Sequence, residues 1–299
     1  MPDYLARHGL RHANYDKRPV VSIPSAQAGD AQQGWPDVCR RLREAADARL
    51  TAGVSRVVIA VECYPGVHVS ELTSAFRQHL SAATLLFSQD AFLPSENIAR
   101  IIAPDLGGDD PIFGRLTRLT YDSLLDPAIQ ASLHARAHDA SVKGLVVVLG
   151  PAACLCCDPD LIVYADLPRW EAQMRQRRHE ISGLGSDDRQ LKPSLAYKRA
   201  FFIDWRIADN LKRRTLPRWD FLLDTTQPGD PRLVTGSALR EALHHCARRP
   251  FRVVPFFDPG PWGGQWMRQV CDLPDGPPNY AWCFDCVPEE NSLLLAFGD

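Results

Sequence analysis

Long apolar stretches are what this 299-residue sequence most clearly lacks. No run approaches the roughly 18 apolar residues that a membrane-spanning helix needs. Residues 1–20 carry several basic and acidic side chains, without the apolar core of a secretory signal. We therefore expect a cytoplasmic protein that has no membrane partner.

The sequence also lacks an excess of charge of one sign. It has 34 Lys and Arg against 36 Asp and Glu, a formal net charge of -2. Proteins that bind nucleic acids or membrane surfaces in general carry a broad basic excess, so we exclude both as partners. Hydrophobic residues make up 45% and charged residues 23%, which is the composition of an ordinary globular protein.

Paired cysteine motifs are scarce although the chain has nine cysteines. Cys283 and Cys286 form a single CxxC with no second pair at the spacing of a zinc finger. Cys154, Cys156 and Cys157 form a small cluster. Without a secretory signal these thiols are expected to be reduced and mostly buried. A zinc site or a redox pair has little support, and we predict no metal ligands.

Alternating apolar strands and helices dominate the middle of the chain. Residues 57–61 form a β-branched run without polar alternation, which is typical of a strand buried on both faces. Further strands are predicted at 84–87, 145–149 and 161–165, and helices at 36–52, 70–80 and 127–141. Residues 91–114 look like a loop. This order predicts an α/β fold, a three-layer doubly wound parallel sheet.

The composition changes towards both ends. Residues 1–35 are polar and rich in Pro, Gly, Ala and Gln, and we interpret them as an N-terminal arm with a short strand at 20–23. From residue 249 Pro, Gly and Trp crowd together and helical periodicity disappears. We expect the α/β domain to span 36–248 and the β-rich segment 249–299 to begin a second, incomplete domain, with strands at 251–257 and 293–297.

The turn after the first central strand, ECYPGVHVS at 62–70, is a candidate phosphate loop because ligands of such sheets bind at the carboxyl ends of the strands. A working loop needs glycines, a Lys for the phosphates and a Ser or Thr for Mg²⁺. Gly66 remains, Val67 stands in the Lys position, and His68 stands in the metal-ligand position with Ser70 close by. The alternative is a plain strand–turn–helix connection.

Asp90 and a group of arginines are the other candidates. Asp90 follows the strand at 84–87 and could accept a proton from a substrate hydroxyl, or simply cap a turn. Arg175, Arg178 and His179 share one face of a helix, and guanidinium groups suit phosphate oxygens. Gly183 and Gly185 then suggest a flexible lid. The alternative is a solvated charged face.

The order of these elements resembles that of uridine-kinase-like P-loop kinases for nucleosides and sugars, over residues 55–245. The features that match are the 57–80 unit, the SQDAF segment with Asp90, the GLVVVLGP strand and the helix in DLIVYADLPRWEAQMRQRR. The resemblance implies ATP and Mg²⁺ as cofactors, Asp90 as the proton acceptor, and Arg175 and Arg178 as groups that neutralise the transferred phosphoryl group. The chain departs from the family at Val67, and at Leu149, where these kinases have an acidic residue.

The C-terminal segment resembles the start of the isomerase domain in a class I mannose-6-phosphate isomerase-like group. The features that match are WGG in FFDPGPWGGQWMRQVCDL and the strand-rich NYAWCFDCVPEENSLLLAFGD. In that group a kinase-like domain precedes a cupin whose divalent metal is held by residues beyond 299. The resemblance implies sugar-phosphate metabolism, with a downstream cupin domain as a partner and no isomerase metal bound by this chain.

Three functions remain open at this point. The first is a kinase-like domain with a degenerate phosphate loop that binds a nucleotide or a small phosphorylated metabolite. The second is an active ATP-dependent small-molecule kinase in which Lys143, Lys192 or Lys198 replaces the missing Lys. The third is a non-catalytic interaction domain.

Overall fold

The computed structural model describes most of the chain between residues 31 and 248. The described residues are 21–22, 31–50, 54–80, 83–108, 110, 113–248, 253–257, 271–272, 282–286 and 295–296. The chain divides into two compact units, one of Ser25–Arg240 and the other of Met1–Pro24 with Glu241–Asp299. None of the helices within these ranges is long and apolar enough to cross a membrane.

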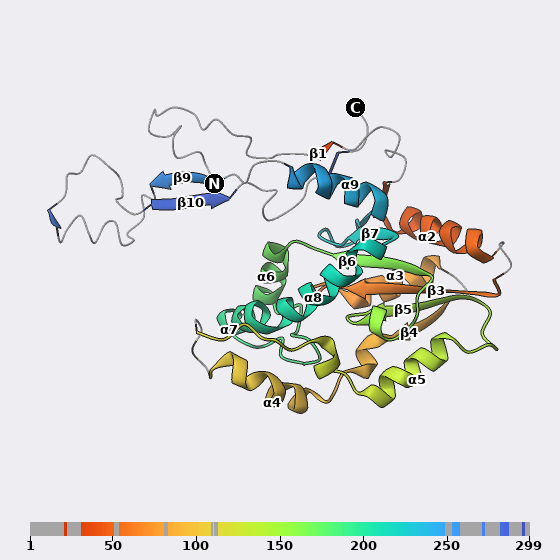
Figure 1. Ribbon diagram of the computed structural model, residues 1–299, viewed down its shortest axis with the longest axis horizontal. Helices are drawn as coiled ribbons and strands as arrows, with labels where there is room; N and C mark the ends of the chain where they lie inside the picture. The colour runs from red at the N-terminus through yellow and green to blue at the C-terminus, as the bar shows by residue number, and fades with distance from the viewer. Residues whose placement is uncertain are drawn as a thin grey trace. The chain divides into compact units, whose positions relative to one another are not determined.

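A seven-stranded sheet forms the centre of the larger unit (Figure 1). The strands lie in the order β2 (Gln32–Gln33), β8 (Arg232–Thr235), β7 (Phe221–Asp224), β6 (Leu161–Asp166), β3 (Arg56–Cys63), β5 (Gly144–Gly150) and β4 (Thr84–Phe87). From β7 to β4 the strands are parallel, whereas β8 is antiparallel to β7, and β2 is antiparallel to β8. The predicted α/β fold is confirmed, with two antiparallel strands added at one edge.

The three central strands form the core because their side chains are apolar on both faces. β3, β5 and β6 are buried over nearly their whole length. β-Branched residues pair directly across them, such as Val58 with Val146 and Val61 with Val163. Strands of this kind are stable only when both faces are covered. Glu62 is the exception, a buried carboxylate near the end of β3.

Helices cover both faces of the sheet, which completes three layers (Figure 1). On one side α2 (Trp35–Leu50) packs against α3 (Val69–His79), and α5 (Pro127–Ala137) lies on the other. Asp126 caps α5 by accepting hydrogen bonds from the amides of Ala128 and Ile129. All three helices are where the sequence predicts them.

The connection from β6 to β7 is long and helical. It contains α6 (Arg169–Arg177), α7 (Pro193–Arg199), the π-helix η5 (Ala200–Asp204), α8 (Trp205–Thr215) and the 3-10 turn η6 (Leu216–Arg218). π-Helical turns are rare and often accompany functional sites. This connection brings many basic side chains of the chain to the carboxyl ends of β3, β6 and β7.

The prediction of a loop over residues 91–114 is wrong, because Ser95–Leu106 forms helix α4. Pro94 lies at the N-cap, where its missing N–H is harmless, and Gly107 ends the helix in a left-handed conformation with φ 65°. Ile98 and Ile102, four residues apart, are buried. Pro94 and Gly107 therefore mark the ends of a helix, and Pro104 lies inside its last turn.

The described part of the smaller unit contains two short strand pairs and the end of a helix. β1 (Val21–Ser22) pairs in parallel with β11 (Leu295–Ala296), and β9 (Val253–Phe257) pairs antiparallel with β10 (Trp282–Cys286). The larger unit ends in α9 (Gly236–Ala247), which continues into the smaller one. The strands expected at both ends of the chain are thus present in shorter form.

Candidate functional site

The turn between β3 and α3 packs tightly against α6. Gly66 has φ 114°, a conformation that favours glycine. A Cβ added to Gly66 would lie 3.0 Å from Cβ of Ala172 on α6 and 3.4 Å from the side chain of Leu167. The predicted phosphate loop therefore has a neighbouring helix in direct contact with its glycine.

Two backbone amides of this turn donate hydrogen bonds to carbonyl groups of the same turn. The amide of Val67 donates to the carbonyl of Tyr64, and the amide of Val69 donates to the carbonyl of Val67, both at 3.1 Å. A working phosphate loop turns such amides towards the phosphates. Val67 is buried, so its side chain reaches no ligand in solution.

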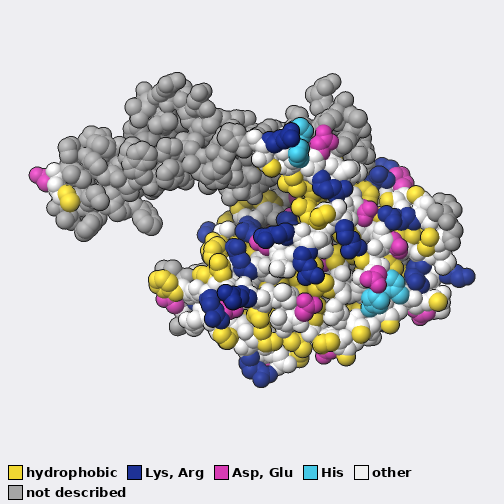
Figure 2. All heavy atoms as spheres, viewed as in Figure 1, with side chains coloured by type: hydrophobic (Ala, Val, Ile, Leu, Met, Phe, Trp, Pro, Cys, Tyr) yellow, Lys and Arg dark blue, Asp and Glu magenta, His cyan; other side chains and the backbone are white. Residues whose placement is uncertain are grey.

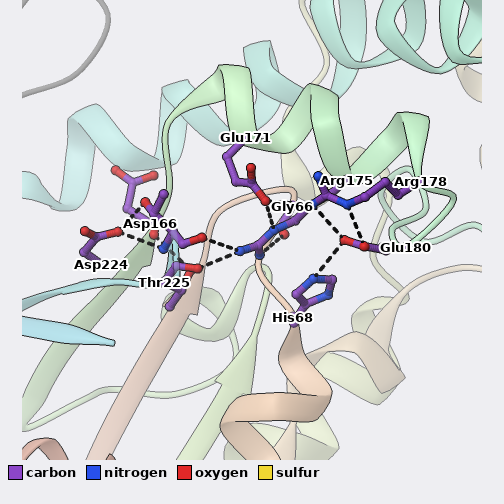
Figure 3. A network of polar contacts seen from close by, with 10 residues as sticks. Gly66, His68, Asp166, Glu171, Arg175, Arg178, Glu180, Asp224 and Thr225 are labelled. Atoms are coloured by element: carbon purple, nitrogen blue, oxygen red, sulfur yellow. Dashed lines mark hydrogen bonds and ion pairs between the residues drawn. The ribbon is translucent and has the colours of Figure 1, made fainter. Parts of the chain in front are cut away.

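Arg175 reaches from α6 into the interior and joins three parts of the chain (Figure 3). Its Nε donates to Glu171 Oε1 at 3.1 Å, and its Nη1 donates to the carbonyl of Gly66 at 2.9 Å. Its Nη2 donates to the carbonyl of Thr225, just after β7, at 2.7 Å. The Arg175 side chain is completely buried. As placed, its guanidinium binds protein oxygens and is not exposed to solvent.

Arg178 and His68 converge on one carboxylate at the surface of the same turn (Figure 3). Arg178 Nε donates to Glu180 Oε1 at 2.7 Å, and its Nη2 donates to Glu180 Oε2 at 3.1 Å. His68 Nε2 lies 3.5 Å from Glu180 Oε2. Arg178 also donates to Glu171 Oε1 at 2.8 Å, so Glu171 links the two arginines. The Glu180 carboxylate thus lies between the Arg178 guanidinium and the His68 imidazole.

Hydrogen bonds from a charged group lower the pKa of Glu180, and burial lowers that of His68. The Arg178 hydrogen bonds hold the pKa of Glu180 below its usual value. Burial, together with the nearby Arg175 charge, lowers the pKa of His68. At neutral pH we therefore expect an ionised Glu180 facing a neutral imidazole and a charged guanidinium.

A second network holds the other side of the turn to α8. The Tyr64 hydroxyl donates to Asp209 Oδ1 at 3.0 Å, and Arg169 Nε donates to the Tyr64 oxygen at 3.2 Å. Lys212 forms an ion pair with Asp166 at the end of β6, and its Nζ lies 4.9 Å from the centre of the Tyr64 ring. Lys212 and Arg169 are therefore the cations on this side of the turn, and each already pairs with a carboxylate.

Most of the larger unit matches a known protein family. Residues 34–248 match the family described as "Domain of unknown function (DUF8485)". The chain belongs to this family. No curated protein matches it. Among solved structures, a "putative fructose transport system kinase" from Silicibacter sp. TM1040 is similar, with a TM-score of 0.40 and 14% identity over 60% of this chain and 94% of that chain.

The family match does not extend to the predicted isomerase relationship. That resemblance depends on residues 256–299, of which the structure describes 256–257, 271–272, 282–286 and 295–296. Nothing in the DUF8485 match supports an isomerase domain or sugar-phosphate metabolism. Both stay predictions.

The predicted site residues separate into two groups in the DUF8485 domain. Gly66, His68, Arg175 and Arg178 belong to the network of Figure 3. Asp90, in the 3-10 turn η2 (Ser88–Ala91), and Ser70, in the first turn of α3, are exposed and take no part in that network. Their predicted roles as proton acceptor and magnesium ligand stay predictions.

The lysines considered as replacements lie away from the turn. Lys143 precedes β5 and so lies at the amino end of the sheet, opposite the candidate site. Lys192 is exposed at the N-cap of α7. Lys198 is buried, and its Nζ donates to the carbonyls of Gly108 and Asp110. None of the three occupies the position of a phosphate-loop lysine.

The glycines of the predicted lid are packed against other residues. A Cβ on Gly183 would lie 2.3 Å from Arg199 Nε, and one on Gly185 would lie 2.3 Å from Ile98 Cδ1 of α4. Arg199 further donates to the carbonyl of Leu184 and to Asp188. The segment is held down by these contacts, and its movement as a lid stays a prediction.

A buried polar cluster was missed by the sequence analysis. Glu62 accepts hydrogen bonds from the amides of Ala152 at 2.7 Å and Cys154 at 2.9 Å, and burial raises its pKa to about 7. Asp204, in η5, is also buried, which raises its pKa to about 6. The Tyr121 hydroxyl and Asp204 Oδ1 have no hydrogen-bond partner among the described residues. An acidic residue at the end of an apolar strand was the available signal for Glu62.

The cysteines beside this cluster are unreactive in this setting. Burial raises the pKa of Cys154 well above its usual value and that of Cys156 to about 12. Thiols in such surroundings stay protonated at neutral pH and are poor nucleophiles and metal ligands.

Proposed function

We propose that the DUF8485 domain binds the phosphate group of a nucleotide or a small phosphorylated metabolite at the β3–α3 turn without transferring it. Arg178 and His68 are the ligands of the anion in this proposal. Glu180 is an internal competitor that covers them when the site is empty. The observation that carries the proposal is the convergence of Arg178 and His68 on the Glu180 carboxylate at the start of α3.

The chemistry of this spot suits an anion. A guanidinium binds a carboxylate or a phosphate through the same pair of N–H donors. The N-terminus of the eleven-residue α3 adds a favourable dipole, and its N-cap residue His68 makes no side-chain capping bond. Arg178 and Glu180 are both partly exposed, so a ligand can replace the carboxylate without opening the core.

Phosphoryl transfer has much less support at this turn. The Lys that would reach the transferred phosphate is replaced by the buried Val67, and Arg175 is committed to backbone carbonyls. Stabilising a transferred phosphoryl group requires cations directed at it in a prepared site. We therefore favour binding over catalysis, and over an interaction domain without a ligand.

Calorimetric titration of the full chain with inorganic phosphate, ATP with and without Mg²⁺, and mannose 6-phosphate tests the proposal. Charge-assisted hydrogen bonds contribute about 1.5–3 kcal/mol, so Arg178→Ala should weaken binding by about 10–100-fold. Glu180→Gln removes the internal competitor and should strengthen binding. Arg189→Ala is the matched control, because Arg189 is an exposed arginine of the same segment with only a 3.5 Å contact to Asp187.

Three outcomes would contradict the proposal. Equal binding by the wild type and Arg178→Ala would remove the assigned ligand. Absence of binding in both the wild type and Glu180→Gln would leave only the interaction domain. Sustained consumption of ATP with a sugar or nucleoside acceptor would instead establish the active kinase.

A further inference from the structure

Two histidines and an aspartate meet on the surface at the amino ends of the strands. His134 and His138 are four residues apart at the end of α5 and so share one face of the helix. Asp158 lies in the short segment that leads into β6. Figure 2 shows histidine side chains beside an acidic one on the surface over this end of α5. The cluster is therefore at the amino ends of the strands, whereas the β3–α3 turn is at their carboxyl ends.

The polar atoms of the three side chains face one another. His134 Nε2 lies 3.1 Å from Asp158 Oδ2. The amide of Asp158 donates to His138 Nε2 at 3.1 Å, which turns that ring nitrogen towards the same point. The two imidazole rings are 4.6 Å apart, and one candidate ligand atom from each residue lies within 4.8 Å of the others.

We propose that His134, His138 and Asp158 bind a divalent transition-metal ion of the zinc class. Imidazole nitrogens and a carboxylate oxygen are ligands that Zn²⁺, Co²⁺ and Ni²⁺ accept, at about 2.0–2.2 Å. A tetrahedral site then needs ligand atoms about 3.3 Å apart, which the exposed His134 and Asp158 and the half-buried His138 reach by small rotations. His138 exchanges its hydrogen bond from the Asp158 amide for the metal, and water fills the remaining coordination.

A metal requires a neutral imidazole, and the surroundings of His138 favour that form. Burial, the neighbouring His134 and the nearby Arg56 lower the pKa of His138, whereas Asp158 and Asp160 act in the opposite direction. Metals bind deprotonated ligands, so a lowered pKa assists binding near neutral pH.

Titration of the full chain with Co²⁺, followed by visible absorption, tests this site directly. We expect one equivalent of Co²⁺ to give the d–d bands of a nitrogen and oxygen site. Loss of an outer-shell partner already weakens metal affinity about 10–100-fold, so His134→Ala and His138→Ala should each weaken it by at least about 100-fold. The matched control is His245→Ala, since His245 lies 3.8 Å from Glu241 in a pair that has no third ligand among the described residues.

A second measurement separates binding from loss of folding. Co²⁺ or Zn²⁺ should raise the melting temperature of the wild type and His245→Ala, because the ions bind the folded chain, but not that of His134→Ala. Circular dichroism should be unchanged in all three variants. Equal Co²⁺ binding by wild type and His134→Ala would overturn the proposal. A strong sulfur-to-cobalt charge-transfer band retained by both histidine variants would also overturn it, because the metal would then be bound by cysteines.

Discussion

Replacing Arg175 with Ala should destabilise the domain by about 3–5 kcal/mol, which is the usual cost of breaking a buried ion pair by removing one partner. Glu171 would lose its buried partner, and the carbonyls of Gly66 and Thr225 would lose their donors. Small domains are stable by only about 5–15 kcal/mol, so this one change removes a large part of the total. The β3–α3 turn and the end of β7 would lose the group that joins them.

Urea denaturation of the full chain, followed by circular dichroism, measures this effect. Arg177→Ala is the matched control, since Arg177 is the exposed arginine two positions along the same helix, and it should change stability by less than about 0.5 kcal/mol. Arg175→Lys should lie between them, because an ammonium lacks the fork that reaches several acceptors. A stability loss for Arg175→Ala no larger than for Arg177→Ala would show that the buried guanidinium does not hold the turn.

The second large effect concerns Glu62 and pH. Burial raises the pKa of Glu62 to about 7 in the folded chain, from an ordinary value of 4.5. Between these two values the folded state keeps a proton that the unfolded state releases. The contribution of protonated Glu62 to the free energy of unfolding is therefore fully present below pH 4.5, and it is lost as the pH rises to about 7. At about 1.4 kcal/mol for each pKa unit, the loss across this window is about 3 kcal/mol.

Comparing Glu62→Gln with the wild type at several pH values isolates this term from other titrating groups. The free energy of unfolding of the variant, relative to the wild type, should rise by about 3 kcal/mol between pH 4.5 and 7.5. Glu180→Gln provides a comparison of opposite sign, because the pKa of Glu180 is lowered and its contribution is lost as the pH falls. A constant difference between Glu62→Gln and the wild type would mean that Glu62 titrates alike in both states.

The elements that could be predicted are those with strong local signals. The β-branched runs in β3, β5 and β6, and the apolar spacing in α2 and α3, are properties of short segments. β7 and β8 were missed because each is short and carries a charged residue at one end, and because each pairs with a strand far away in the sequence, β6 and β2 respectively. α4 was missed because its flanking Pro94 and Gly107 were interpreted as signs of a loop.

The candidate site shows the same division between local and distant information. A missing lysine at Val67 and clustered arginines at 175 and 178 can be seen in the sequence. The directions of these side chains cannot be seen in the sequence. Arg175 in α6 and Arg178 at the end of α6 are one helical turn apart, yet Arg175 is buried and Arg178 is half-exposed. The packing of Ala172 against Gly66 decides which of them faces the interior.

The sequence by itself determined the α/β class, the position of the β3–α3 turn and the absence of a lysine from that turn, because hydrophobic periodicity and residue chemistry are local properties. Only the tertiary structure decided that Arg175 binds the turn from within, that Glu180 covers His68 and Arg178, and that His134, His138 and Asp158 meet. These contacts join residues far apart in the sequence, such as Arg175 and Gly66, which are 109 positions apart, and they depend on how helices dock on the sheet. Docking is set by the packing of the whole core, which no single segment specifies.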